Sequence, residues 1–444
     1  MKIQLSDHFT YGRMIRFTLP SIAMMIFSSV YGVVDGFFVS NYVGGTPFAA
    51  LNLVMPFIMI MAAVGFMFGT GGSALVAVKL GMGEKENANR IFSLIIYLLI
   101  AAGLVLGAIG FVVAAPVARR LGATEAMLPY CVLYARINML GMVPLMLQFS
   151  FQSFFIVAEN PKLGLYVTLA AGCINMFLDW LFMGVLGLGL ESAAAASVTG
   201  MIVGGVIPLI YFGRENSSLL KLGRPVRDFG VVAKAAANGA SEFMSNISVS
   251  VVSMMYNHQL LKFAGERGVS AYGIIMYTNF IFIGVFFGFS IGIGPVIGYH
   301  YGTGEKDELK NLFGRSLRII GIAALIMLVL SEILAKPLAM IFAGYDETLL
   351  TMTTHAIRIY SLSYIIMGFN IFGSALFTAL NNGLISALIS CFRTLLFQLA
   401  AVFILPAIWG LDGIWLAIVA AEACAVVITV VCIICCHRRY DYCA

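Results

Sequence analysis

The sequence of 444 residues contains little charge: Asp, Glu, Lys and Arg make up 11% of it, whereas 61% is hydrophobic. Soluble domains carry roughly 25% charged residues, so most of this chain cannot face water. Apolar stretches recur along the whole length, and the mean hydropathy is +0.98. These values exclude an ordinary soluble protein and predict a polytopic membrane protein.

The sequence also lacks the motifs on which many catalytic and metal sites depend. It contains no HExxH and no GxSxG, and its 5 histidines are scattered near expected helix ends. Nothing in it resembles the selectivity filter of a channel. We therefore expect neither an enzyme nor a passive channel, and we assign no catalytic residue and no cofactor.

Disulfide and zinc spacings are absent from the 8 cysteines. We expect reduced or apolar thiols, with acylation near the membrane as the alternative for the group close to the C-terminus. The net charge of +5 does not indicate a nucleic-acid partner, because the basic residues lie between apolar segments. The cysteines of the C-terminal group are Cys424, Cys432, Cys435, Cys436 and Cys443.

The apolar segments are long enough to cross a bilayer, for which a helix needs about 20 residues. The first has no cleavage site after a short apolar core, so we expect a spanning helix and not a signal peptide. By this measure the sequence predicts twelve helices, at 13–40, 48–79, 91–115, 128–158, 163–184, 192–213, 231–262, 270–302, 313–333, 351–379, 383–409 and 412–437.

Basic residues are distributed unevenly between the two sets of connecting loops. An even number of spans places both termini on one side, and the loops on that side hold most of the Lys and Arg. The positive-inside rule then predicts that both termini are cytoplasmic. The outer loops hold only Arg119, Arg120, Lys262, Arg267 and Lys336.

The chain contains an internal repeat. GMGEKENANRIF at 81–92 resembles GTGEKDELKNLF at 302–313, and Asn160 and Asn382 match at nearly the same offset. The repeat unit therefore contains six helices, and because six is even, both halves enter the membrane from the same side. Such halves are related by an axis along the membrane normal, which is an arrangement found in secondary transporters.

The predicted fold is an all-α polytopic membrane protein with twelve transmembrane helices in two six-helix lobes, related by a pseudo-twofold axis. We expect an N-lobe at 1–213, a cytoplasmic linker at 214–230 and a C-lobe at 231–444. The substrate site of such a protein is expected between the lobes, near the middle of the membrane.

Polar residues inside the apolar segments need a reason, because an ionised acid at a helix centre costs about 2.5–3.5 kcal/mol. Asp35, Asn175, Asp179 and Ser197 are expected at similar depth in the outer half of the N-lobe. Their oxygens suit a sodium-like cation, and two neighbouring acids can also share a proton. The alternative is a set of solvated helix ends and interhelical hydrogen bonds.

The C-lobe contains its own buried charges. Glu242 and Glu422 are expected near the middle of the membrane, where a cationic substrate can pair with them. Arg393 is a candidate for the substrate cleft as well, but we expect it to balance an acid or to line a wet cleft rather than to bind substrate. Pro20 precedes Asp35 in the same helix, and because proline kinks a helix, we expect a hinge there.

These motifs together resemble the multidrug and toxic compound extrusion (MATE) family, and most closely its MepA-like bacterial branch. The resemblance covers essentially the whole chain. It rests on LPSIAMMIFSSVYGVVDGFFVSNYVGG in the first helix, the two GEK loops, AENPKLG after the fourth helix, NMFLD in the fifth and GLGLESAAAASV at the sixth.

The resemblance implies an exporter of cationic or amphipathic drugs and dyes that works by antiport with protons or sodium. It also implies that Asp35, Asn175 and Asp179 form the cation site, which would hold Na⁺ if sodium drives transport. Ser197 stands where the family often has Thr, and the hydroxyl is kept. Glu159 stands where Gly is common, and we interpret it as loop variation.

Other transporters remain as alternatives. A flippase for lipid-linked oligosaccharides belongs to the same superfamily, but such proteins usually have more helices or a basic central cavity. A major facilitator transporter also has two six-helix halves, but its second loop usually carries an Asp-Arg signature that GMGEKENANR lacks. We expect a monomer that contacts membrane lipid and binds small cationic molecules.

Overall fold

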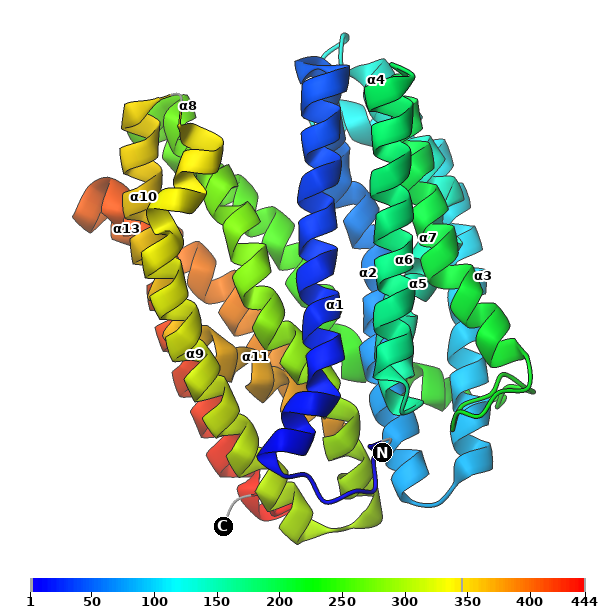
Figure 1. Cartoon of the computed structure of the whole chain (residues 1–444). Helices are drawn as coiled ribbons and strands as arrows, with labels where there is room; N and C mark the ends of the chain where they lie inside the picture. The colour runs from blue at the N-terminus through cyan, green and yellow to red at the C-terminus, as the bar shows by residue number, and fades with distance from the viewer. Residues whose placement is uncertain (1–2, 345, 443–444) are drawn as a thin grey trace.

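The computed structural model describes residues 3–344 and 346–442, and the regular structure in this part of the chain is entirely helical. Long helices stand side by side, and both termini lie at one end of the molecule, here termed the terminal face (Figure 1). The other end is termed the opposite face. Cys443 lies outside the described residues, and the cysteines within them are free.

The first half of the chain forms six spans. The Thr10 hydroxyl accepts a hydrogen bond from the Arg13 backbone nitrogen and so caps the first helix. Pro161 begins a later one, at a position where its missing N–H is not needed. The spans are α1 (Tyr11–Phe38) with η1 (Val39–Val43), α2 (Gly45–Gly81), α3 (Lys85–Arg120), α4 (Leu128–Leu140) with α5 (Met142–Val157), α6 (Pro161–Asp179) with η2 (Trp180–Val185), and α7 (Leu190–Gly213).

The second half repeats this arrangement. Asp346 caps one of its helices by accepting hydrogen bonds from the backbone nitrogens of Thr348 and Leu349. The elements are α8 (Phe229–Thr303), α9 (Lys306–Ala343), α10 (Glu347–Ser361) with α11 (Tyr364–Ala379), and α12 (Gly383–Cys391) with η3 (Phe392–Leu396) and α13 (Phe397–Tyr440).

Two of these elements contain a reversal of direction. A straight helix of the 75 residues of α8 would be about 110 Å long, far more than the roughly 30 Å of a bilayer core. The chain turns at Gly265 (φ 62°) in α8 and at Gly410 (φ 58°) in α13, in a backbone region that favours glycine. The pairs α4–α5 and α10–α11 are each one span, bent by 59° and 50°. The predicted twelve helices are confirmed.

Several helices are longer than the sequence predicted. The span predicted at 91–115 is the middle of α3, and the one predicted at 313–333 is the middle of α9. Hydropathy marks only the part of a helix that lies in the bilayer core. The backbone hydrogen bonds continue beyond it, through polar residues that face water.

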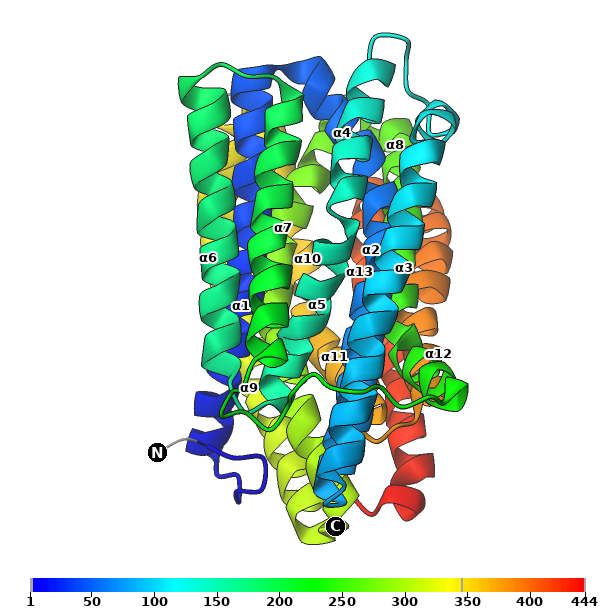
Figure 2. The ribbon, with the colours of Figure 1, turned by 90° about the vertical axis from the view of Figure 1, so that its right-hand side faces the viewer.

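The hydrophobic interior is divided into two cores. One is built mostly from α2 to α7, and the other mostly from α8 to α13. The segment between α7 and α8 is not helical, and in Figure 2 it crosses the molecule near the terminal face. We propose to divide the chain accordingly into an N-lobe (1–213), a linker (214–230) and a C-lobe (231–444).

Glycines bring the two lobes into close contact near the terminal face. A side chain at Gly71 of α2 would collide with the backbone of Ala235 and Gly239 in α8. Closer to the terminal face, a side chain at Gly81 would collide with the backbone of Tyr299, and one at Gly302 with the backbone of Val78. The lobes are thus packed against each other in this half of the molecule, whereas the ribbons diverge toward the opposite face in Figure 1.

The segment before α1 contacts both lobes. The backbone nitrogen of Leu5 donates to Glu159 Oε1 in the N-lobe (2.8 Å), and that of Phe9 donates to Glu308 Oε1 in the C-lobe (2.9 Å). Glu159 has a φ of 57°, in the left-handed region where glycine is favoured. The interpretation of Glu159 as loop variation is therefore incomplete, because its side chain also holds the N-terminal segment.

Candidate functional site

The four polar residues predicted in the N-lobe lie in the half of the molecule nearer the opposite face. Asp35 is in the last turn of α1, and Asp179 is the last residue of α6, one turn after Asn175. Ser197 is in the second turn of α7, which starts at the same end. Because α1 and α6 run toward the opposite face and α7 runs back from it, all four residues lie at a similar depth.

The structure brings these side chains together in the lobe interior. Asp179 is 0% exposed and Asp35 7%, and their carboxyl groups are close enough to share a hydrogen bond. Asn175 Nδ2 donates to Ser197 Oγ at 3.5 Å. Both oxygens of Asp179, Asp35 Oδ1 and Asn175 Oδ1 have no donor within reach among the described residues.

This arrangement leaves negative charge uncompensated. Two carboxylates cannot donate to each other, so their contact becomes a hydrogen bond only when one of them holds a proton. Neither Asp35 nor Asp179 forms an ion pair with a basic residue in the described part of the chain. Chemically, the cluster fits a proton shared by the two acids or a hard cation coordinated by oxygens.

One member of the cluster was not predicted from the sequence. Tyr134 of α4 is fully buried, and its hydroxyl lies near the side chains of Asn138 and Ser197, without a hydrogen bond of standard geometry to any described residue. It interacts electrostatically with both Asp35 and Asp179. A tyrosine inside an apolar helix carries no pattern that distinguishes it from a core residue, so the sequence offered no signal for it.

Short π-helical segments accompany the buried charges. The segment η1 begins four residues after Asp35, η2 begins directly after Asp179, and η3 contains Arg393. An extra residue in a turn changes the direction of the side chains around it, and such segments are frequent at functional sites. They occur in both lobes, each within four residues of a buried charged residue.

The buried charges of the C-lobe are arranged differently. Arg393 Nε donates to both carboxylate oxygens of Glu422, at 2.8 and 3.1 Å. Asn370 Nδ2 donates to the same carboxylate at 2.7 Å, and Asn370 Oδ1 in turn accepts from Thr429. Glu422 is 0% exposed, so this acid is fully paired inside the lobe.

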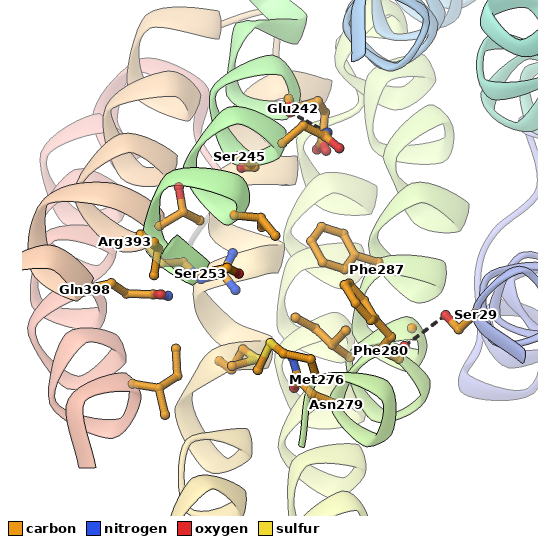
Figure 3. Close-up of a pocket in the computed structure, with 18 of the residues that line it drawn as sticks. Ser29, Glu242, Ser245, Ser253, Met276, Asn279, Phe280, Phe287, Arg393 and Gln398 are labelled. Carbon is orange, nitrogen blue, oxygen red and sulfur yellow. Dashed lines mark hydrogen bonds between the residues drawn. The ribbon is translucent and has the colours of Figure 1, made fainter. Parts of the chain in front are cut away.

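A cavity of about 270 Å³ lies beside this network. Figure 3 shows Glu242 and Ser253 on one wall, Phe280 and Phe287 across from them, and Arg393 at the side. Most of the lining comes from the C-lobe, and Met25, Ser29, Phe66 and Thr70 of α1 and α2 complete the wall.

The acid that remains available to a ligand in this cavity is Glu242. Its side chain is partly exposed, and its carboxylate has no hydrogen-bond partner in the described part of the chain. Its electrostatic partner is Arg393. A second, smaller cavity of about 50 Å³ also touches Glu242 and is lined by the hydroxyls of Thr70, Ser73 and Ser290.

The remaining predicted residue, Pro20, lies buried within α1, whose helical hydrogen bonding continues to Phe38. Its role as a hinge stays a prediction. The four N-lobe cluster residues do not line the cavity, whereas Glu242, Glu422 and Arg393 do. The structure therefore separates the predicted residues into two places.

Comparison with known proteins gives consistent results. A family model described as MatE matches residues 20–181 and again 243–404. Over 424 residues the chain is 22% identical to the multidrug export protein MepA of Staphylococcus haemolyticus (strain JCSC1435), covering 94% of this chain and 91% of that protein. The two matches of the family model fall in the two lobes, as the internal repeat predicts.

Solved structures share the fold. A crystal structure of MATE in complex with MaL6 superposes with a TM-score of 0.92 at 20% identity, over 98% of this chain and 97% of that one. The outward-facing conformation of a multidrug resistance MATE family transporter of the MOP superfamily gives 0.87 at 20% identity, over 96% and 95% of the two chains. These similarities extend over both lobes.

Proposed function

Because the chain belongs to the MatE family, whose members are transporters and not enzymes, we propose that it exports amphipathic molecules with a positive charge in exchange for protons or sodium. The name of the staphylococcal relative, multidrug export protein, supports multidrug efflux. Transport of this kind needs no cofactor.

The observation that carries this proposal is the position of α1 between the two sites. The helix holds Asp35 near the opposite face, and lower down it contributes Met25 and Ser29 to the wall of the cavity. Ser29 Oγ also donates to the Phe280 carbonyl of α8 at 3.1 Å (Figure 3). A change in the packing of α1 around Asp35 therefore reaches the cavity through one continuous helix.

In the proposed cycle, a proton or Na⁺ from outside binds among Asp35, Asn175, Asp179 and Ser197. The bound cation removes the uncompensated charge, and the helices that hold these residues move closer together. We propose that α1 then bends at Pro20, narrows the cavity and releases the substrate outward. Rocking of the two lobes returns the empty site to the cytoplasm, as in alternating access.

Substrate binding is assigned to the cavity. Glu242 supplies a negative charge for a cationic group, and Phe66, Phe280 and Phe287 provide an apolar wall for a flat hydrophobic body. Glu422 and Arg393 line the same space, but they are paired with each other in the absence of a ligand.

The protein is a multi-pass membrane protein, and we place it in a bacterial plasma membrane as a monomer in contact with lipid. The concentration of Lys and Arg on the terminal face supports a cytoplasmic position for that face and for both termini. The close contact of the lobes at Gly71 and Gly81 then lies on the cytoplasmic side, which supports an outward-facing state.

The test is dye transport by purified protein in proteoliposomes, with sodium and pH gradients imposed separately. We expect one of the two gradients to drive transport of a cationic dye against its concentration gradient. Dissipating the driving gradient with an ionophore for the same ion should stop transport. Equal dye movement with and without both gradients would contradict the proposal of antiport.

A further inference from the structure

Arg393 is placed so that it serves more than its pairing with Glu422. Both of its hydrogen bonds to this acid start from Nε. The terminal amino groups, Nη1 and Nη2, form no hydrogen bond among the described residues, and Arg393, which is 5% exposed, lines the cavity. These are the donors that an Arg uses to bind a carboxylate in a bidentate manner.

The partner of Arg393 cannot turn away from it. Glu422 is held from the other side by Asn370 at 2.7 Å and is 0% exposed. The guanidinium is therefore held at Nε, and Arg393 lines the cavity with donors that these two bonds do not use. A fixed and partly desolvated donor set makes a stronger site than a mobile surface Arg.

The ligand space thus contains fixed groups of both signs. Glu242 and Arg393 both line it and interact electrostatically with each other. Aromatic and Met side chains, among them Phe280, Phe287 and Met276, cover the space between the polar groups. A simple cation pairs with Glu242 and leaves the terminal amino groups of Arg393 facing an apolar body.

We propose that Arg393 is a specificity determinant that binds a carboxylate of the substrate, so that the cavity is built for amphoteric aromatic molecules. The ammonium or iminium end of such a molecule lies beside Glu242, and the carboxylate lies on Nη1 and Nη2 of Arg393. This inference rests on the proposed function and narrows its substrate class from cations to molecules that carry both charges.

The probes are a rhodamine dye with a free carboxylate and its methyl ester. The two share the same aromatic cation and differ only in whether the carboxylate is available. Each is tested in everted membrane vesicles, where dye accumulation reports export. We expect the wild type to export both, and the acid to compete with the ester for transport.

The decisive variant removes the charge pair as a unit. Arg393→Gln combined with Glu422→Gln leaves no unpaired buried charge, and Asn370 can still donate to the new amide. The apparent affinity for the acid should fall by about 10- to 100-fold more than the apparent affinity for the ester. Glu242→Gln, in contrast, should weaken the binding of both dyes, because both carry the positive charge.

A matched control is the Arg358–Glu332 pair of the same lobe, which is largely exposed with an N–O distance of 3.7 Å. Removing both of its charges should leave the export of both dyes unchanged. Competition in the wild type does not depend on the folding of any variant: an acid that fails to slow export of the ester overturns the inference. So does a double variant that still exports the acid at the wild-type level.

The two proposals fail in different ways. A wild type that exports the ester but not the acid keeps the proposed function and overturns the amphoteric substrate class. A wild type that moves neither dye under any imposed gradient, with the protein present in the membrane, contradicts the proposed function itself.

Discussion

The two lobes bury acids under opposite conditions. In the N-lobe, Asp35 and Asp179 lie next to each other with no basic partner in the part of the chain that the structure describes, whereas in the C-lobe Glu422 accepts from Arg393 at 2.8 Å. An isolated buried charge is strongly unfavourable, so the N-lobe pair needs a proton or a cation, and the C-lobe pair is neutral by itself. The first arrangement suits a site whose occupancy changes during transport, and the second suits a fixed recognition site.

The internal repeat shows how far the lobes have diverged. By the offset of the repeat, which is 221 residues between the two GEK loops and 222 between Asn160 and Asn382, the counterpart of Asp35 falls at Tyr256 or Asn257. A position that carries an acid in one half thus carries a neutral residue in the other. We propose that the two halves perform different tasks, which the following changes are designed to test.

The largest effect is expected from Asp35→Asn. The amide cannot carry the charge that a driving cation neutralises, so occupancy of the N-lobe site no longer controls α1. We expect drug resistance to fall to the level of cells without the transporter, while the amount of protein in the membrane is unchanged. The measurements are the growth-inhibiting drug concentration and an immunoblot of the membrane fraction.

The matched control for this change is Asp412→Asn. Asp412 is half-exposed and contacts His355 near the opposite face. It is therefore an acid of the same chain that lies outside both sites. It should retain wild-type resistance. Wild-type resistance in Asp35→Asn cells as well would mean that the uncompensated N-lobe charge has no part in coupling.

The pairing of Arg393 with Glu422 in the C-lobe should contribute measurably to the stability of the protein. Glu422→Gln alone leaves the Arg393 charge buried without its partner, and breaking a buried pair in this way typically costs about 3–5 kcal/mol. Removing both charges should recover most of that loss. The measurement is the apparent melting temperature of the purified single and double variants in detergent.

The exposed Arg358–Glu332 pair gives the scale for this comparison. Removing either of its charges should change stability by at most about 1 kcal/mol, because water screens such pairs. A double variant of Arg393 and Glu422 that is as unstable as the single variant would show that these two residues stabilise the lobe independently and not as a pair.

The sequence predicted the number of helices and the division into halves, because apolar runs and repeated motifs can both be recognised in the sequence alone. It also predicted that Asp35 and Asp179 lie at one depth, since depth follows from the position along a helix. The pairing of Arg393 with Glu422 was one of two interpretations left open, because these residues are 29 positions apart on different elements.

Other parts of the site have no recognisable pattern in the sequence. The π-helical segments η1, η2 and η3 contain ordinary apolar residues, and no periodicity marks the extra residue in a turn. Tyr134 reaches the acids from α4, which packs against α2, α3 and α7. Such contacts depend on how helices rotate against one another, which the spacing of apolar residues does not determine.

The smallest expected effect is that of Ser197→Ala. Its hydroxyl accepts from Asn175 at 3.5 Å, a long hydrogen bond, so its loss should weaken the site without emptying it. A hydrogen bond of this kind contributes about 0.5–1.5 kcal/mol, which corresponds to a roughly 2- to 10-fold weaker apparent affinity for the driving cation. The measurement is the concentration of that cation at half-maximal transport.

Ser197→Thr is the matched variant, because it keeps the hydroxyl and adds only a methyl group. It should restore the affinity that Ser197→Ala loses, with maximal transport similar in all three proteins. If Ser197→Ala instead shifts the concentration dependence of the dye and leaves that of the cation unchanged, Ser197 belongs functionally to the cavity. The separation of a coupling lobe from a recognition lobe would then be wrong at this residue.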